Sequence, residues 1–210
     1  MISLMVNDPQ FASELIAERR ARQLDRYDEV WEDLYMMSPL ANNEHQSLAT
    51  ELSAAIVTVV DWQNLGRTLT GANVSDRRDD WTRNYRIPDV LVFTNDTGGE
   101  DCGTHWLGGP DLAIEIVSPG DRTLEKLDFY TKVGTQELLV IDRDPFQLTL
   151  YQVNQHRKMV PVAVSRFETP TRIDSGIFPL SFKLNPDTQT LDVIRDRDTL
   201  VRGIPVLRAA

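Results

Sequence analysis

The amino-acid sequence predicts a single α/β domain. Three observations lead to this prediction: the chain has 210 residues, it contains short apolar runs typical of buried strands, and segments with helical periodicity alternate with them. A chain of this length fits one domain with a sizeable hydrophobic core. The hydrophobic share of 41% and the charged share of 26% are ordinary for a globular protein. We find no internal repeat and no linker that would divide the chain into independent domains.

Three segments are predicted to be helices because apolar residues recur in them at helical spacing. Residues 8–24 carry a thin apolar stripe, which is too narrow for a helix of the core. Residues 43–64 carry a broad apolar face that fits a core helix. Residues 121–133 follow an apolar run, with Asp121 expected as the N-terminal cap and Gly134 as the stop.

Short runs bounded by turn residues are predicted to be strands. Residues 27–37 form a hairpin with an acidic turn, and residues 67–74 follow the second helix as a strand. Residues 90–93 and 112–117 are mostly apolar, as strands buried on both faces are. Residues 137–141 follow the third helix, which is expected to join two parallel strands by a right-handed crossover. The remaining runs, 148–153, 159–164, one near Phe182 and 191–194, predict an antiparallel extension.

Composition and charge limit the classes of function. The formal net charge is −10, so the chain lacks the general excess of Lys and Arg with which proteins grip nucleic acid over their whole surface. A bound cation or a local basic rim can still offset the repulsion at one cleft. The single cysteine, Cys102, excludes an intramolecular disulfide, and no apolar run reaches the roughly 18 residues of a membrane span. A cytoplasmic protein with no membrane partner is therefore expected.

A polar loop is predicted at residues 75–86. It carries Arg77, Arg78, Arg83 and Arg86 among three aspartates. These arginines are suited to contact phosphates, and they are equally suited to pair with the aspartates on a solvated surface. The sequence leaves both alternatives open.

Glu115 is the most informative charged residue of the chain. It lies in the middle of residues 112–117, a run that is otherwise apolar. A carboxylate buried there without a partner would lose several kcal/mol of solvation, so it should meet a cation or hold a proton. The alternative is a strand with one face in water, on which Glu115 is simply exposed.

Asp89 and Lys126 are candidates to complete a site around Glu115. Asp89 opens the other apolar run, so two neighbouring strands would each offer one carboxylate. Such hard oxygen ligands suit Mg²⁺ or Mn²⁺, which lower the pKa of a bound water and stabilise charge on a phosphate. Lys126 lies in the helix that follows the Glu115 strand. The alternatives are a turn residue after proline for Asp89 and a solvated helix face for Lys126.

Four segments together resemble one known family. They are Ile87-Pro88-Asp89-Val90, Asp111-Leu112-Ala113-Ile114-Glu115-Ile116-Val117-Ser118-Pro119, Glu125-Lys126-Leu127-Asp128-Phe129-Tyr130 and Val140-Ile141-Asp142. In order and spacing, over residues 27–151, they resemble the Uma-type family of restriction endonuclease-like proteins, which is placed in the PD-(D/E)XK nuclease superfamily. The resemblance implies a mixed β-sheet flanked by helices. His45 also fits a family position, but a single histidine is more often a helix-cap or surface residue than a catalytic base.

The resemblance also implies roles for individual residues. The Pro-Asp motif falls on Asp89 and the second acid on Glu115, which makes these two residues the expected metal ligands. In the standard motif a lysine stands two residues after the second acid, where this chain has Val117. Lys126 in the next helix is therefore expected to be the catalytic lysine. An early family glutamate matches Glu29, which is either a further catalytic carboxylate or an exposed strand residue.

These features predict a Mg²⁺- or Mn²⁺-dependent endonuclease that hydrolyses phosphodiester bonds of DNA. The alternative is a non-catalytic protein that keeps the nuclease fold to bind nucleic acid or a protein partner, which the missing strand lysine and the acidic surface favour. Residues 1–26 are expected to be a helical extension, 27–151 the family-like core, and 152–210 a β-rich extension of the same domain. The thin stripe of the first helix and the extra strands also predict a homodimer.

Overall fold

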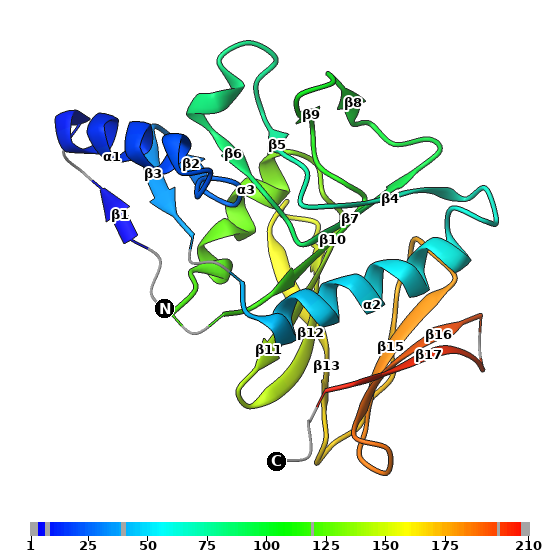
Figure 1. The fold of residues 1–210 in the computed structure, drawn as a ribbon. Coiled ribbons are helices and arrows are strands. Elements are labelled where there is room, and N and C mark those ends of the chain that lie inside the picture. Colours follow the sequence, from blue (N-terminus) through cyan, green and yellow to red (C-terminus); the bar gives the residue numbers. More distant parts are fainter. Residues whose placement is uncertain (1–3, 7–8, 39–40, 119, 197, 207–210) are drawn as a thin grey trace.

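The fold is organised around a six-stranded mixed sheet (Figure 1). The structure is a computed structural model that describes residues 4–6, 9–38, 41–118, 120–196 and 198–206. In spatial order the strands are β13 (Met159–Arg166), β12 (Phe146–Val153), β11 (Glu137–Arg143), β10 (Leu112–Ile116), β7 (Val90–Thr94) and β4 (Gly66–Thr70). Strands β10 and β11 are parallel, as predicted for a helical crossover, and the other neighbours in this sheet are antiparallel.

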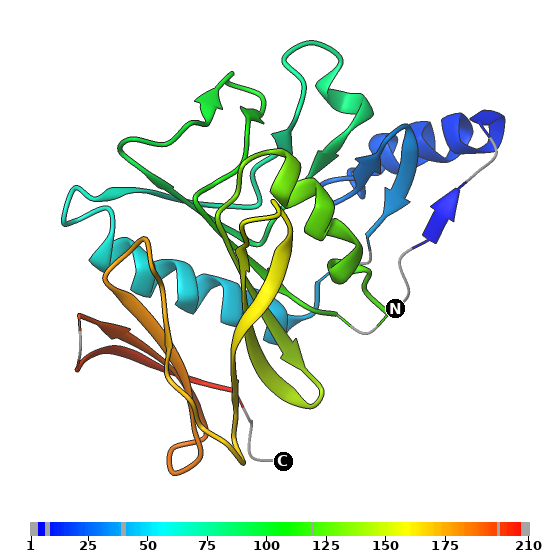
Figure 2. The same cartoon turned by 180° about the vertical axis from the view of Figure 1, so that it is seen from behind.

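The two central strands are buried on both faces, as their apolar sequences predict. Along β7, Val90 and Val92 belong to one hydrophobic cluster, whereas Leu91 and Phe93 belong to the other. This alternation is the two-residue period of a strand. The first cluster also holds the apolar face of α2 (Asn43–Val59), and the second holds Phe129 and Tyr130 of α3 (Leu127–Lys132). Seen from behind, α3 covers the face of the sheet that lies away from α2 (Figure 2).

A four-stranded antiparallel sheet near the C-terminus packs on the first cluster. It consists of β14 (Ile173–Asp174), β15 (Leu180–Asn185), β16 (Thr190–Arg195) and β17 (Thr199–Pro205). Side chains from these strands, among them Phe182 and Val193, join the same hydrophobic cluster as α2. The antiparallel pairing agrees with the predicted extension for the run near Phe182 and for 191–194. The runs at 148–153 and 159–164, predicted to belong to the same extension, are instead strands β12 and β13 of the central sheet.

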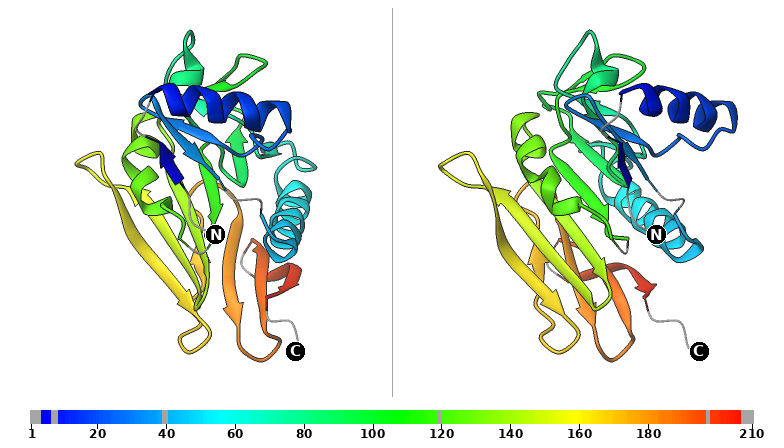
Figure 3. Two further views of the ribbon diagram at one scale, coloured as in Figure 1. Left: turned by 60° about the vertical axis from the view of Figure 1, so that its left-hand side comes forward. Right: turned by 90° about the vertical axis from the view of Figure 1, so that its left-hand side faces the viewer.

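A third sheet of short strands lies beside the central one. Its spatial order is β1 (Leu4–Val6), β3 (Leu34–Met37), β2 (Glu29–Trp31), β6 (Tyr85–Arg86), β5 (Val74–Ser75), β9 (Trp106–Leu107) and β8 (Glu100–Asp101). The predicted hairpin is the pair β2–β3, and its turn residues Glu32 and Asp33 both have positive φ. Helix α1 (Pro9–Ala21) lies at the outside of this sheet (Figure 3), and none of residues 11–21 is buried.

Three element boundaries differ from the sequence predictions. Helix α2 ends at Val59, because the next residues form a turn in which Asn64 is left-handed. The strand predicted at 67–74 ends at Thr70, where Gly71 has a φ of +59°. The helix predicted at 121–133 is a 3₁₀ segment, η2 (Thr123–Lys126), followed by α3. Asp121 does not cap it, because the residue before the 3₁₀ segment is Arg122, and Asp121 Oδ1 accepts the N–H of Arg122 instead of one inside the segment. The backbone N–H of Asp121 donates to the Ser118 carbonyl and closes a turn.

The polar loop at 75–86 contains a 3₁₀ turn, η1 (Trp81–Arg83), between β5 and β6. Its ends are more buried than the sequence suggested, because the Ser75 hydroxyl donates to the Asn84 carbonyl at 2.7 Å inside the third sheet. Among the described helices, none is both long enough and apolar enough to cross a membrane.

Candidate active site

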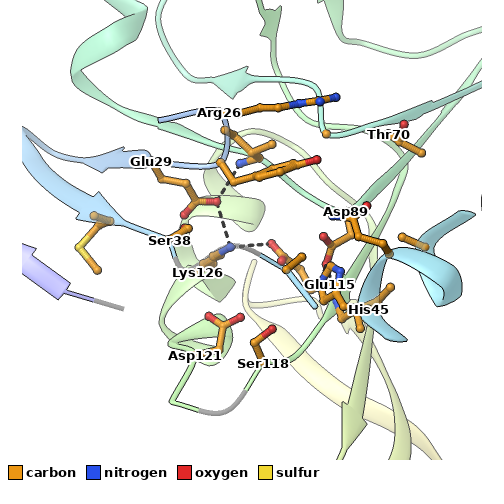
Figure 4. A pocket seen from close by; sticks show the side chains of 18 of the residues that line it. Arg26, Glu29, Ser38, His45, Thr70, Asp89, Glu115, Ser118, Asp121 and Lys126 are labelled. Atoms are coloured by element: carbon orange, nitrogen blue, oxygen red, sulfur yellow. Dashed lines mark hydrogen bonds and ion pairs between the residues drawn. The ribbon is translucent and has the colours of Figure 1, made fainter. Parts of the chain in front are cut away.

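Glu115 is buried, and its partner is Lys126. Successive side chains of β10 point alternately into the two hydrophobic clusters: Ile114 and Ile116 belong to the first and Ala113 to the second. Glu115 therefore lies on the same face as Ala113, the face that α3 covers. Its Oε1 atom is 3.0 Å from Lys126 Nζ, and the same ammonium is 3.0 Å from Glu29 Oε1 (Figure 4). The exposed fractions are only 3% for Glu115, 6% for Lys126 and 4% for Glu29. The structure therefore contradicts the alternative in which Glu115 and Lys126 lie on solvated faces.

Glu29 is fixed by several donors. Its Oε1 atom accepts the backbone N–H of Ile87 at 2.8 Å in addition to the Lys126 ammonium. Its Oε2 atom accepts the indole N–H of Trp31 at 2.7 Å. Because both oxygens are already bound by the protein, this carboxylate is suited to hold Lys126 in place.

The charges of this cluster perturb each other strongly. The pKa of Glu115 is raised to about 8, chiefly by burial and also by the charges of Asp89 and Glu29, while the Lys126 ammonium lowers it. Burial opposes the charge on Lys126, but the carboxylates of Glu115 and Glu29 outweigh it and hold the Lys126 pKa above its ordinary value. The Tyr130 hydroxyl also donates to Glu115 Oε1. Such mutual perturbation is typical of functional sites, although structural ion pairs show it too.

Asp89 lies next to Glu115 in the sheet. The register pairs Ile114 with Val90, which puts Glu115 beside Asp89 at the following position. Asp89 Oδ2 accepts the backbone N–H of Ile116 at 2.7 Å and lies 3.3 Å from His45 Nε2. Among the described residues, Asp89 Oδ1 and Glu115 Oε2 have no hydrogen-bond partner. Each carboxylate therefore keeps one oxygen available.

One pocket joins these groups. Its volume is about 340 Å³, and Glu29, Asp89, Glu115 and Lys126 all line it (Figure 4). The residues predicted from the sequence, which come from four separate segments, are thus brought together. Within the described part of the chain, no three His, Cys, Asp or Glu side chains are grouped closely enough to hold a metal ion by themselves. Two available carboxylates fit Mg²⁺, which usually keeps several waters and takes one or two carboxylates plus substrate phosphates.

Arg86 is a neighbouring residue that the sequence analysis did not single out from its loop. Its guanidinium carbon lies 4.6 Å from the ring centroid of Trp31 and 4.2 Å from that of Phe129. The side chain is 5% exposed and donates to the Val30 carbonyl at 2.9 Å. Burial lowers its pKa, while the Glu29 carboxylate favours the charged form. Arg86 therefore packs the hairpin that carries Glu29 against α3.

The other arginines of the polar loop are paired at the surface. Arg77 lies 2.7 Å from Glu32, Arg83 lies 2.6 Å from Asp33, and Arg78 pairs with Glu100. Their charges are thus balanced at the surface, but mainly by carboxylates outside the loop. Among the described contacts, the loop's own aspartates contribute only Asp76, 3.7 Å from Arg77. These arginines contribute little net positive charge with which to bind phosphates.

Two partners of the site were missed by the sequence analysis. Tyr130 stands four residues after Lys126, the spacing at which side chains share a helix face. Trp31 stands two residues after Glu29, the spacing at which side chains share a strand face. Both spacings were visible in the sequence and identify the groups that bind Glu115 and Glu29.

Comparisons with known proteins relate this geometry to a family. The sequence model of the Uma2 family, described as "Putative restriction endonuclease", matches residues 12–194. Among solved structures, a "putative nuclease belonging to DUF820" from Anabaena variabilis is similar, with a TM-score of 0.52 and 23% sequence identity. The match covers 64% of this chain and 75% of that chain, and it shows a shared fold. No curated protein matches the chain.

Proposed function

The chain belongs to the Uma2 family of putative restriction endonucleases, and from this premise we propose that it hydrolyses phosphodiester bonds of DNA with Mg²⁺ or Mn²⁺. The observation that carries the proposal is the buried Lys126 ammonium, which lies between Glu29 and Glu115 in the same pocket as Asp89. A cation stabilises charge on a phosphate, and convergent carboxylates can hold a catalytic metal ion, so this pocket has groups suited to phosphodiester hydrolysis.

Lys126 is the proposed catalytic lysine. An ammonium has three N–H donors, and two of them serve Glu29 and Glu115. The third is available to a phosphate oxygen in the pocket, where it would neutralise the charge that develops during hydrolysis. Glu29 acts as a positioning residue, because its own contacts with Ile87 and Trp31 fix the ammonium.

Asp89 and Glu115 are the proposed metal ligands, through the oxygens that remain available on each. With Glu29, they place three carboxyl groups around one ammonium. Burial favours a proton on Glu115, so an added divalent cation would favour its ionised, metal-binding form. A bound Mg²⁺ or Mn²⁺ supplies Lewis-acid chemistry and an activated water. The backbone N–H of Ile116 and the ring of His45 orient Asp89 for this purpose.

A digestion assay tests the proposed activity. Plasmid and single-stranded DNA should be cleaved in Mg²⁺ or Mn²⁺ and left intact in chelator. Glu115→Gln should remove the activity, because the amide lacks the charge of a metal ligand. Glu14→Ala, on the exposed face of α1, is the matched control and should cleave normally. Intact DNA with every metal would instead favour the non-catalytic alternative.

We also propose that the protein is a homodimer. Leu15 and Ile16 of α1 are only half-buried, so part of the apolar face of this helix is exposed. A second copy of the chain could bury it. Sedimentation equilibrium should give twice the 23.9 kDa mass of one chain. Leu15→Glu should shift the equilibrium toward monomer. A wild-type monomer at high micromolar concentration would contradict this proposal.

A further inference from the structure

The pocket extends beyond the charged cluster of Glu29, Asp89, Glu115 and Lys126. Its volume of about 340 Å³ is at the lower end of the ~300–1,000 Å³ typical of small-molecule pockets. A DNA duplex instead presents a rod with one phosphate charge per about 1.7 Å, which calls for an extended basic surface. The arginines of the neighbouring loop are already paired with carboxylates. A single nucleotide therefore suits this pocket better than an intact duplex.

The wall formed by α2 is polar and uncharged. Gln46, Thr50 and Ser53 line the pocket at spacings of four and three residues, which put them on one face of the helix. Ala49 on the same wall leaves room because its side chain is small. Amide and hydroxyl groups can hydrogen-bond to a neutral base edge. This wall thus differs chemically from the ionic cluster at Lys126.

The edge of the pocket carries an aromatic residue and a cation. The Arg26 guanidinium carbon lies 5.4 Å from the ring centroid of Tyr27, and both residues line the pocket. Arg26 is exposed, and among the described residues no carboxylate forms an ion pair with it. In Figure 4, Arg26 lies on the opposite side of Lys126 from Asp121. An aromatic ring stacks bases, and an unpaired arginine attracts phosphate.

We propose that the substrate of this pocket is an unpaired DNA strand, of which one nucleotide enters the pocket. Its base stacks on Tyr27 and contacts the polar wall of α2, and the phosphate of a neighbouring nucleotide binds Arg26. The scissile phosphate lies at Lys126, Glu115 and Asp89. This inference rests on the proposed nuclease function. It assigns Tyr27 as the residue that selects single strands and Arg26 as a phosphate contact that adds affinity.

The preference for single strands is tested by measuring DNA binding and DNA cleavage separately. Fluorescence anisotropy in Ca²⁺ compares an end-labelled single strand with a duplex of the same sequence, and cleavage of both follows in Mn²⁺. The single strand should bind about 5- to 150-fold more tightly, the contribution of one base stacked on an aromatic ring. Tyr27→Ala should lose this preference by raising KM more than it lowers kcat, and Tyr27→Phe should retain it.

Arg26→Gln should lower the slope of log K against log salt by about 0.7, the value for one phosphate contact with a single strand. The matched control is Arg157→Gln. Arg157 is exposed in the turn between β12 and β13. The strand register puts this turn at the Leu112 end of β10, whereas the pocket lies at the Ile116 end. It should behave as wild type.

The outcomes separate the two proposals. If the duplex binds as tightly as the single strand, and Tyr27→Ala changes neither of these two affinities, the inference is overturned even when DNA is cleaved. If single strands are preferred through Tyr27 but no DNA is cleaved, the strand selection stands and the nuclease function fails. Loss of the preference in Tyr27→Phe as well as in Tyr27→Ala would also overturn the stacking role.

Discussion

Replacing Lys126 with methionine should lower the free energy of unfolding by about 3–5 kcal/mol at neutral pH, the range for removing one partner of a buried ion pair. Its ammonium is 3.0 Å from both Glu115 and Glu29, and all three side chains are buried. Methionine has a similar length, so it removes the charge without opening a large cavity. The buried carboxylates of Glu115 and Glu29 would then lie together without the ammonium between them. Urea denaturation measures the loss.

The matched control is the same substitution at Lys132, at the end of α3, the helix that directly follows Lys126. Lys132 pairs with Asp76 at 2.6 Å and with Glu32 at 3.1 Å, but its side chain is 53% exposed. Ion pairs at the surface contribute little, so Lys132→Met should change the free energy of unfolding by less than about 1 kcal/mol. An equal loss in both variants would show that the buried cluster has no special effect on stability.

Mn²⁺ at about 100 times its Kd should raise the free energy of unfolding by roughly 2.7 kcal/mol, because it binds the native state alone. For a domain of this size the melting temperature should rise by about 5–11 °C. The gain arises because Asp89 and Glu115 are neighbouring carboxylates that repel each other in the absence of a cation. Glu115→Gln should remove most of the gain, while its amide oxygen can still accept from Lys126 and Tyr130.

Glu137 provides the control for this melt. It is also a buried glutamate, on the strand next to β10, but it accepts from Ser175 at 2.6 Å and from Gly176 at 2.8 Å. Glu137→Gln should therefore keep the full Mn²⁺ shift. If Glu115→Gln keeps it too, Glu115 is not a metal ligand and the proposed mechanism loses one of its two ligands.

Much of the fold was predictable because the patterns that indicate its strands and helices lie within single short segments of the sequence. The apolar runs at 90–93 and 112–117 predict strands buried on both faces, and β7 and β10 confirm them. The family resemblance and the mixed α/β fold were likewise predicted correctly from the quoted motifs. Glu115 could be recognised as exceptional because a charge in such a run needs a partner.

What the sequence did not reveal depends on contacts between distant segments. Lys126 and Glu29 are 97 positions apart, and nothing local to either residue predicts their ion pair. The boundary at Thr70 depends on the left-handed Gly71, and Asp121 closes a turn with Ser118 where a helix cap was expected. Trp62, a residue type that usually packs against other side chains, is 72% exposed after the end of α2. Tertiary context decides such details more than local propensity does.

The position of Arg86 makes one wall of the pocket stiffer than the other. Because its guanidinium lies between the rings of Trp31 and Phe129, the β2–β3 hairpin cannot move away from α3 without uncovering a buried cation. Across the pocket, the first turns of α2 present Gln46 and Thr50, whose side chains are exposed. Because the apolar face of α2 is held in the first hydrophobic cluster, changes in the shape of the pocket should come mainly from these exposed side chains, while the ammonium of Lys126 and its two carboxylates keep their mutual geometry.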